Sequence, residues 1–167
     1  NVLAQVPDLN DFVGGTKLLL APQGVVTIEF PHLMKLMEEN QFDTIYHEHF
    51  FYFSLLSAER VFAAHGLALF DVEELSTHGG SLRIYAHHVD DTTYRMTDRY
   101  RELKRREQTA GFERAETYAL FAERVKERRT VIAVEAALAE PAPDPLFVPR
   151  NVRVEVADAR SLPLEDE

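Results

Sequence analysis

The chain has 167 residues, 46% of them hydrophobic and 28% charged, which is ordinary for one globular domain or for part of a larger protein. It holds no cysteine, which excludes a disulfide framework, cysteine-ligated zinc within this chain and a cysteine nucleophile, and favours a cytoplasmic location. The net charge is −10, and residues 1–93 contain only Lys17, Lys35, Arg60 and Arg83 as fixed cations, which argues against a nucleic-acid partner. No apolar run approaches the ~18–20 residues that span a bilayer, so no membrane partner is expected.

The first part of the chain predicts a strand end, a helix, a strand and a second helix. Residues 1–6 are apolar and are expected to form the end of a buried strand or the turn after it. Asp8 is the expected N-cap of the first helix, which ends at residues 21–24. Residues 24–30 are rich in β-branched side chains, and their nearly continuous apolar character favours a central strand buried on both faces. A short helix over residues 32–40 follows.

A third helix and two more strands are predicted before residue 93. Ser57 is the expected N-cap of a helix over residues 58–65, which Gly66 closes. Residues 67–73 and 81–88 predict strands, and the short loop between them indicates an antiparallel pair.

From Tyr94 the pattern changes to charged amphipathic helices, broken at Gly111 and ended by a run of prolines. The order of elements predicts an α/β fold, namely the second half of an open sheet with an antiparallel edge, followed by helices. Residues 1–93 are the expected half-sheet domain, residues 94–139 a helical segment and residues 140–167 a Pro-rich mobile tail. Open sheets of this kind bind ligands at the carboxyl ends of their strands.

The densest group of acid–base side chains is Tyr46-His47-Glu48-His49-Phe50, which lies in an aromatic run. Aromatic surroundings are dry, which favours acid–base chemistry. On a strand or a helix His47 and His49 point away from each other, and the metal-binding spacing of two histidines at i and i+4 is absent. A regular strand would also separate Tyr46 and Glu48 from His49, so a site that uses all three requires an irregular loop.

Several interpretations of this segment stay open on the residues alone. A histidine beside a carboxylate makes a general acid–base pair, and Tyr46 could hydrogen-bond an oxyanion that develops on a substrate. A half-buried cluster that only satisfies loop backbone groups accounts for the residues equally well. A metal site on His47 and His49 is a weaker alternative because of the spacing. Nucleophilic catalysis has no support, because no Ser or Cys lies in a nucleophile-elbow setting.

His78-Gly79-Gly80-Ser81 is a second candidate segment. Two glycines in a turn most often mean a tight turn between strands. The functional interpretation is close approach of the backbone to a ligand, with His78 or Ser81 contacting it.

Four segments stand out together for their order and spacing. They are Asn1-Val2-Leu3-Ala4-Gln5-Val6-Pro7-Asp8, Glu29-Phe30-Pro31, Gln41-Phe42-Asp43-Thr44-Ile45-Tyr46-His47-Glu48-His49-Phe50 and Thr77-His78-Gly79-Gly80-Ser81-Leu82-Arg83. In combination they resemble the sugar C-methyltransferases of the S-adenosylmethionine-dependent class I type, over roughly residues 1–128. The resemblance implies that this chain is the C-terminal portion of a Rossmann-like class I methyltransferase, with a zinc-binding domain upstream and a further α/β domain after it.

The resemblance also implies a reaction. Members methylate a carbon next to a keto group of a nucleotide-linked sugar, with S-adenosylmethionine as the methyl donor. His49 would be the base that removes the proton from that carbon, while Tyr46 and Glu48 would stabilise and orient the enolate-forming sugar. The enolate carbon would then attack the methyl group, and alignment of the two supplies much of the acceleration. Substrate-binding residues would be His78 and Ser81.

The sequence departs from the family pattern in three places. Gln5, the expected cofactor-binding residue, stands where the family commonly has His, and an amide can hydrogen-bond but cannot carry a proton. The cofactor's glycine-rich turn and the zinc-ligating cysteines belong upstream of Asn1, so little or no activity is expected of this chain alone. Residues from about Arg129 do not resemble the family's further domain.

Two other functions are kept beside the enzyme. One is a non-catalytic remnant or interaction domain of a methyltransferase, which is expected to self-associate through an uncovered sheet edge. The other is a metal hydrolase that uses His47 and His49.

Overall fold

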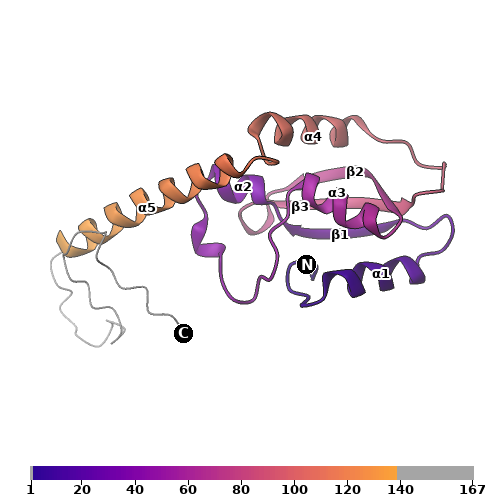
Figure 1. Cartoon of the computed structure of the whole chain (residues 1–167), viewed down its shortest axis with the longest axis horizontal. Helices are drawn as coiled ribbons and strands as arrows, with labels where there is room; N and C mark the ends of the chain where they lie inside the picture. The colour runs from indigo at the N-terminus through magenta and orange to yellow at the C-terminus, as the bar shows by residue number, and fades with distance from the viewer. Residues whose placement is uncertain (1, 139–167) are drawn as a thin grey trace. The chain divides into compact units, whose positions relative to one another are not determined.

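The computed structural model of the chain describes residues 2–138. The chain divides into two units, Asn1–Phe121 and Ala122–Glu167, and the first contains the sheet and every candidate site residue (Figure 1). Within the described part no helix is both long and apolar enough to cross a bilayer. The Pro-rich tail predicted over residues 140–167 lies outside the described residues.

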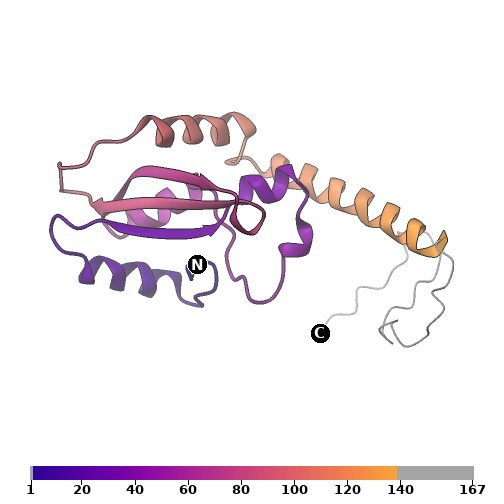
Figure 2. The same cartoon turned by 180° about the vertical axis from the view of Figure 1, so that it is seen from behind.

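A three-stranded antiparallel sheet forms the centre of the first unit (Figures 1 and 2). Its strands are β1 (Val26–Pro31), β2 (Leu67–Leu75) and β3 (Ser81–His88), in the order β1-β3-β2. The predicted antiparallel pairing of β2 with β3 is confirmed, and β3 pairs on its other side with β1, where Ile28 lies opposite Ile84. Because β1 and β2 are both antiparallel to β3, they run in the same direction.

The apolar segment at residues 24–30, predicted as a central strand, has only one neighbouring strand among the described residues. Within the described residues β1 is an edge strand, paired with β3 alone. Its residues Val26 and Ile28 are only partly buried, whereas Phe30 is completely buried. An apolar edge of this kind is typical of a strand that pairs with a further segment.

The predicted helix starts are correct for one helix and displaced for another. α1 (Leu9–Leu19) begins after Asp8, whose side chain accepts a first-turn backbone N–H at 2.9 Å, as predicted. α3 (Leu55–Ala64) begins earlier than expected, since its N-cap is Ser54. Ser57, the predicted N-cap, is instead the third helical residue, and its hydroxyl accepts the Ser54 N–H at 2.9 Å to complete a capping box.

The described residues form five further helical elements. They are α2 (Leu33–Glu38), η1 (Phe42–Thr44), η2 (Thr77–Gly79), α4 (Asp98–Ala110) and α5 (Ala115–Leu138). The break predicted at Gly111 is confirmed, because this residue ends α4 in the left-handed conformation with φ 81°.

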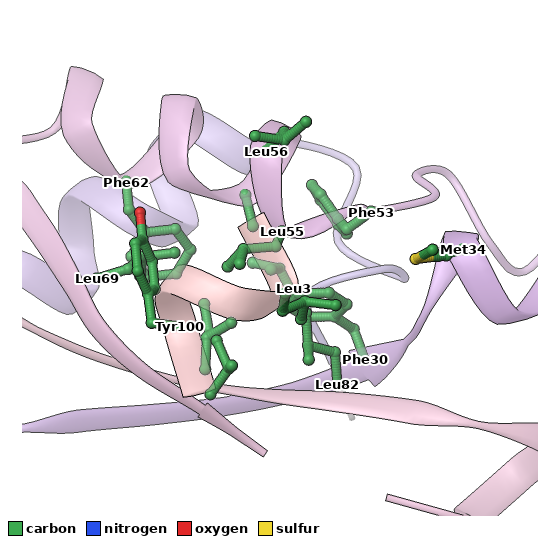
Figure 3. Close-up of a cluster of buried hydrophobic side chains, with 14 of the residues drawn as sticks. Leu3, Phe30, Met34, Phe53, Leu55, Leu56, Phe62, Leu69, Leu82 and Tyr100 are labelled. Carbon is green, nitrogen blue, oxygen red and sulfur yellow. The ribbon is translucent and has the colours of Figure 1, made fainter. Parts of the chain in front are cut away.

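The hydrophobic core lies between the sheet and the helices α3 and α4, which both contact β2. Figure 3 shows Tyr100 of α4 beside Phe62 and Leu69, and Leu3 of the N-terminal segment beside Phe30. Leu3 is fully buried although it belongs to a turn, one of the two conformations expected for residues 1–6. Burying one such side chain contributes about 1.5–3 kcal/mol. The N-terminal turn is therefore anchored firmly enough to position Gln5.

Candidate functional site

The Tyr-His-Glu-His segment forms a tight turn. The backbone N–H of His49 donates to the Tyr46 carbonyl at 3.0 Å, so these two residues close a four-residue turn with His47 and Glu48 at its centre. This is the irregular loop that a joint site requires. The Tyr46 and His49 rings lie together, with centroids 4.5 Å apart. His49 is half-buried, whereas Tyr46 is 43% exposed and His47 and Glu48 are exposed too.

Hydrogen bonds define the tautomer of His49. Its Nδ1 lies 3.3 Å from the carbonyl oxygen of Thr44, and because a carbonyl only accepts, Nδ1 carries the hydrogen. In the neutral ring Nε2 then holds a lone pair, which faces the Tyr46 hydroxyl at 3.3 Å. The arrangement presents one basic nitrogen beside one phenol.

Backbone contacts hold this turn against the N-terminal segment. The N–H groups of Phe50 and Phe51 both donate to the Ala4 carbonyl, at 2.8 and 3.2 Å. Ala4 is itself buried at 2% exposure. Gln5 therefore lies beside the turn that carries His49.

The turn between β2 and β3 has an unusual backbone. His78 adopts φ 52° and ψ 38°, a left-handed conformation that a residue other than glycine rarely takes, and Gly80 has φ 119°. A Cβ atom added to Gly80 would lie 2.9 Å from the Lys35 side chain, and one on Gly79 would lie 2.9 Å from the Gln41 amide. The two glycines thus make a tight turn, and their backbone closely approaches the side chains of Lys35 and Gln41.

These segments enclose a hollow of about 440 Å³. Its lining consists of Gln5, Pro31, His32, Leu36, Gln41, Thr44, Tyr46, His49, His78 and Gly80. Four of the six predicted site residues therefore line one pocket although they come from three separate segments.

The other two predicted site residues lie outside this lining. Glu48 is exposed on the turn. Ser81 is 1% exposed, and its hydroxyl donates to the Thr77 carbonyl at 3.2 Å. The orienting role of Glu48 and the substrate contact of Ser81 stay predictions.

The pocket also contains residues that the sequence did not indicate. His32 is buried in its wall, and its Nε2 lies 2.8 Å from the carboxylate of Glu107. In the sequence, a single histidine between a proline and a helix gives no sign of a functional role. No sequence spacing connects His32 with Glu107, which lies 75 residues further along the chain. Two buried acceptor atoms, Gln5 Oε1 and His32 Nδ1, have no hydrogen-bond partner within the described residues.

A smaller hollow of about 210 Å³ lies between β2 and α4. Each charged residue of its lining is in an ion pair, for example Arg106 with Glu74 at 2.7 Å, so it has the character of a surface ion-pair network. None of the predicted site residues lines it. In the described residues no group of three or more His, Asp or Glu side chains is placed to hold a metal ion.

Parts of the chain match known C-methyltransferases. Residues 76–143 match the family model described as the C-methyltransferase C-terminal domain. The chain is also 47% identical over 83 residues to the C-methyltransferase NovU of Streptomyces niveus. The resemblance to the C-methyltransferases is thereby confirmed.

Each match covers only part of the chain. The aligned part is 50% of this chain and 20% of NovU, so the chain spans about a fifth of the length of that relative. The C-methyltransferase family match begins at the turn before β3 and includes His78, Ser81 and Glu107. It continues to residue 143, so the expectation that the similarity ends near Arg129 is wrong.

Proposed function

We propose that this chain is the C-terminal part of an S-adenosylmethionine-dependent C-methyltransferase that acts next to the keto group of a nucleotide-linked sugar. The match to the C-methyltransferases supports the reaction class. The observation that carries the proposal is the pocket that gathers Gln5, Tyr46, His49 and His78, with the His49 lone pair at its wall.

Proton removal is the step that these residues support best. His49 Nε2 takes the proton from the carbon next to the keto group, the electron pair of the C–H bond forms the enolate double bond, and negative charge moves to the keto oxygen. The Tyr46 hydroxyl faces Nε2 at 3.3 Å, and rotation of its O–H toward the keto oxygen would free the lone pair and stabilise the oxyanion. The Thr44 carbonyl holds the imidazole by Nδ1 throughout.

When bound, S-adenosylmethionine would supply an electrophilic methyl group to the enolate carbon. Gln5 is the residue of this chain that would contact the cofactor. Its Oε1 is buried in the pocket wall without a partner in the described part of the chain, which fits a hydrogen-bond donor such as an ammonium or hydroxyl group. The seven glycines of the chain include no Gly-X-Gly pattern, so this chain supplies only one side of a cofactor site.

The fold proposal is that β1, β3 and β2 continue a Rossmann-like parallel sheet. β1 and β2 run in the same direction, and the outer edge of β1 pairs with nothing in the described residues. A parallel strand from a preceding segment could hydrogen-bond along that edge. The cytoplasmic location stays a prediction.

Deuterium exchange tests this function. The full-length protein is incubated in D2O with 4-keto-6-deoxyhexoses linked to thymidine, uridine, guanosine or cytidine diphosphate. Mass spectrometry is expected to show deuterium uptake next to the keto group of one sugar without the cofactor, and methylation of that sugar with it. Absence of both with every sugar overturns the proposal. Micromolar binding of S-adenosylmethionine to this chain alone, by calorimetric titration, would contradict a one-sided cofactor site.

A non-catalytic interaction domain is the second candidate. It is favoured by the unpaired edge of β1 and by Leu18 and Leu19, which are 87% and 90% exposed at the end of α1. This candidate predicts self-association on a sizing column, and a monomer at micromolar concentration argues against it.

A further inference from the structure

Glu107 and His32 form a buried pair behind the pocket. Both side chains are 0% exposed, and His32 Nε2 lies 2.8 Å from Glu107 Oε1. Glu107 is on α4, and His32 lines the pocket at the start of α2. Because the His32 Nδ1 atom has no partner within the described residues, the imidazole is held there by its bond to Glu107.

Glu107 also holds the start of α3. Its two carboxylate oxygens accept the N–H groups of Leu55 and Leu56 at 2.8 and 2.9 Å. These are first-turn donors that have no partner inside the helix. Because Oε1 of Glu107 already accepts the Leu55 N–H, we assign it as the acceptor for His32 as well, with His32 donating through Nε2.

The backbone around His32 joins the two segments that carry the site. The His32 N–H donates to the Gly80 carbonyl at 3.0 Å, next to the turn that carries His78. The following N–H, of Leu33, donates to the Phe53 carbonyl at 2.9 Å, at the end of the loop that carries His49. A displacement of His32 therefore shifts both segments.

We propose that Glu107 is a positioning residue that acts through His32, and this inference rests on the proposed function. By fixing the His32 imidazole it fixes the spacing between the His78 turn and the turn that carries His49. That spacing sets where the keto sugar lies relative to the base. A displacement of about 1 Å can cost about 100-fold in rate.

Four single variants and one double variant of the full-length protein separate positioning from stability. His32→Phe keeps a ring but loses the bond, His32→Gln keeps an N–H donor near the place of Nε2, and Glu107→Gln removes the charge. Ser54→Ala is the matched control, because it weakens the N-cap of the same helix, α3, where the Ser54 side chain hydrogen-bonds to Ser57 and not to His32. Circular dichroism at the assay temperature establishes that each variant is folded.

The measured quantities are kcat and KM for deuterium exchange, with thymidine diphosphate 4-keto-6-deoxyglucose as the first probe and the other keto sugars in turn. His32→Phe is expected to lower kcat by about 10- to 100-fold with KM within about threefold, because positioning is lost and binding is kept. His32→Gln is expected to stay within about threefold of wild type. The kcat of the double variant His32→Phe/Glu107→Gln is expected to be no lower than that of the slower single variant. Both single changes break the same hydrogen-bonded pair, so their effects should not add. Ser54→Ala should lower the melting temperature and leave kcat unchanged.

The outcomes distinguish the two proposals. If the wild type exchanges deuterium and His32→Phe has the kcat of Ser54→Ala, the positioning role is overturned and the function stands. If the wild type exchanges with no sugar, the function falls, and nitrogen-15 spectra of the histidine rings decide the positioning role. Shifts of the His49 and His78 resonances in His32→Phe, but not in Ser54→Ala, support it, and unchanged resonances overturn it.

Discussion

Tyr46 and His49 close one β-turn, and the Tyr46 hydroxyl lies 3.3 Å from Nε2 of His49. On a strand, residues three apart face opposite sides of the sheet, so the two side chains could not cooperate. The turn places them on one side and leaves His47 and Glu48 exposed. The spacing Tyr-X-X-His is therefore what pairs the phenol with the base.

Replacing the base tests the assignment of His49. The variant His49→Gln is expected to lower the rate of deuterium exchange into the keto sugar by about 100-fold or more, because an amide cannot accept the proton. His47→Gln is the matched control, since it changes the same residue type at an exposed position of the same turn. It should exchange at the wild-type rate, and equal losses in both variants would refute the assignment.

Removing the phenol tests the oxyanion role of Tyr46. Tyr46→Phe is expected to lower kcat by about 100-fold, the effect of losing one hydrogen-bond donor to an oxyanion, with little change in KM. Tyr94→Phe serves as the control, because the Tyr94 hydroxyl contacts the Gln23 carbonyl, away from the pocket lining. A Tyr46→Phe enzyme of normal kcat would remove Tyr46 from the chemistry.

Local sequence patterns predicted where helices and strands form better than they predicted which strands lie side by side in the sheet. The Asp8 cap, the Gly111 break and the pairing of β2 with β3 all depend on nearby residues, and all three are confirmed. The position of β1 was predicted wrongly for the described residues, because apolar content reports burial and not which strand lies alongside. The displaced start of α3 has a local cause: two serines compete for the cap, and both satisfy part of it.

The same difference between local pattern and tertiary contact applies to the candidate site. The sequence could indicate Tyr46 and His49 as a dense acid–base segment, and the structure brings them into one pocket with Gln5 and His78. The sequence could not indicate that His32 pairs with Glu107 of α4, because that contact arises from tertiary packing.

The turn between β2 and β3 gives a stability prediction. Gly80→Ala is expected to lower the free energy of unfolding by about 1–3 kcal/mol, because the residue has φ 119° and an added Cβ would lie 2.9 Å from the Lys35 side chain. Gly15→Ala is the control inside α1, where a Cβ meets nothing within 4 Å, and it should stabilise by about 0.5–1 kcal/mol. Urea unfolding measures both, and a neutral Gly80→Ala would contradict the crowding.

Asp71 connects β2 to the start of α4. Its carboxylate accepts hydrogen bonds from the Thr97 hydroxyl at 2.5 Å, from the Val72 N–H at 2.9 Å and from the guanidinium of Arg99. Burial raises the pKa of this carboxyl, but the hydrogen bonds from Arg99 and Thr97 outweigh burial and hold the pKa below its ordinary value of 3.8. A group whose pKa is lowered on folding stabilises the protein above its unfolded pKa, and this contribution is lost as pH falls through the folded value.

The variant Asp71→Asn should therefore be less stable than wild type by about 1 kcal/mol at pH 7, allowing for the half-exposed arginine. The difference should persist down to about pH 4 and shrink at lower pH, where the wild-type carboxyl takes up its proton. Urea unfolding at pH 7, 5, 4 and 3 measures it. Asp90→Asn, at an exposed position, is the control and should change stability by less than about 0.5 kcal/mol at every pH. A difference for Asp71→Asn that grew on acidification would have the wrong sign for a lowered pKa.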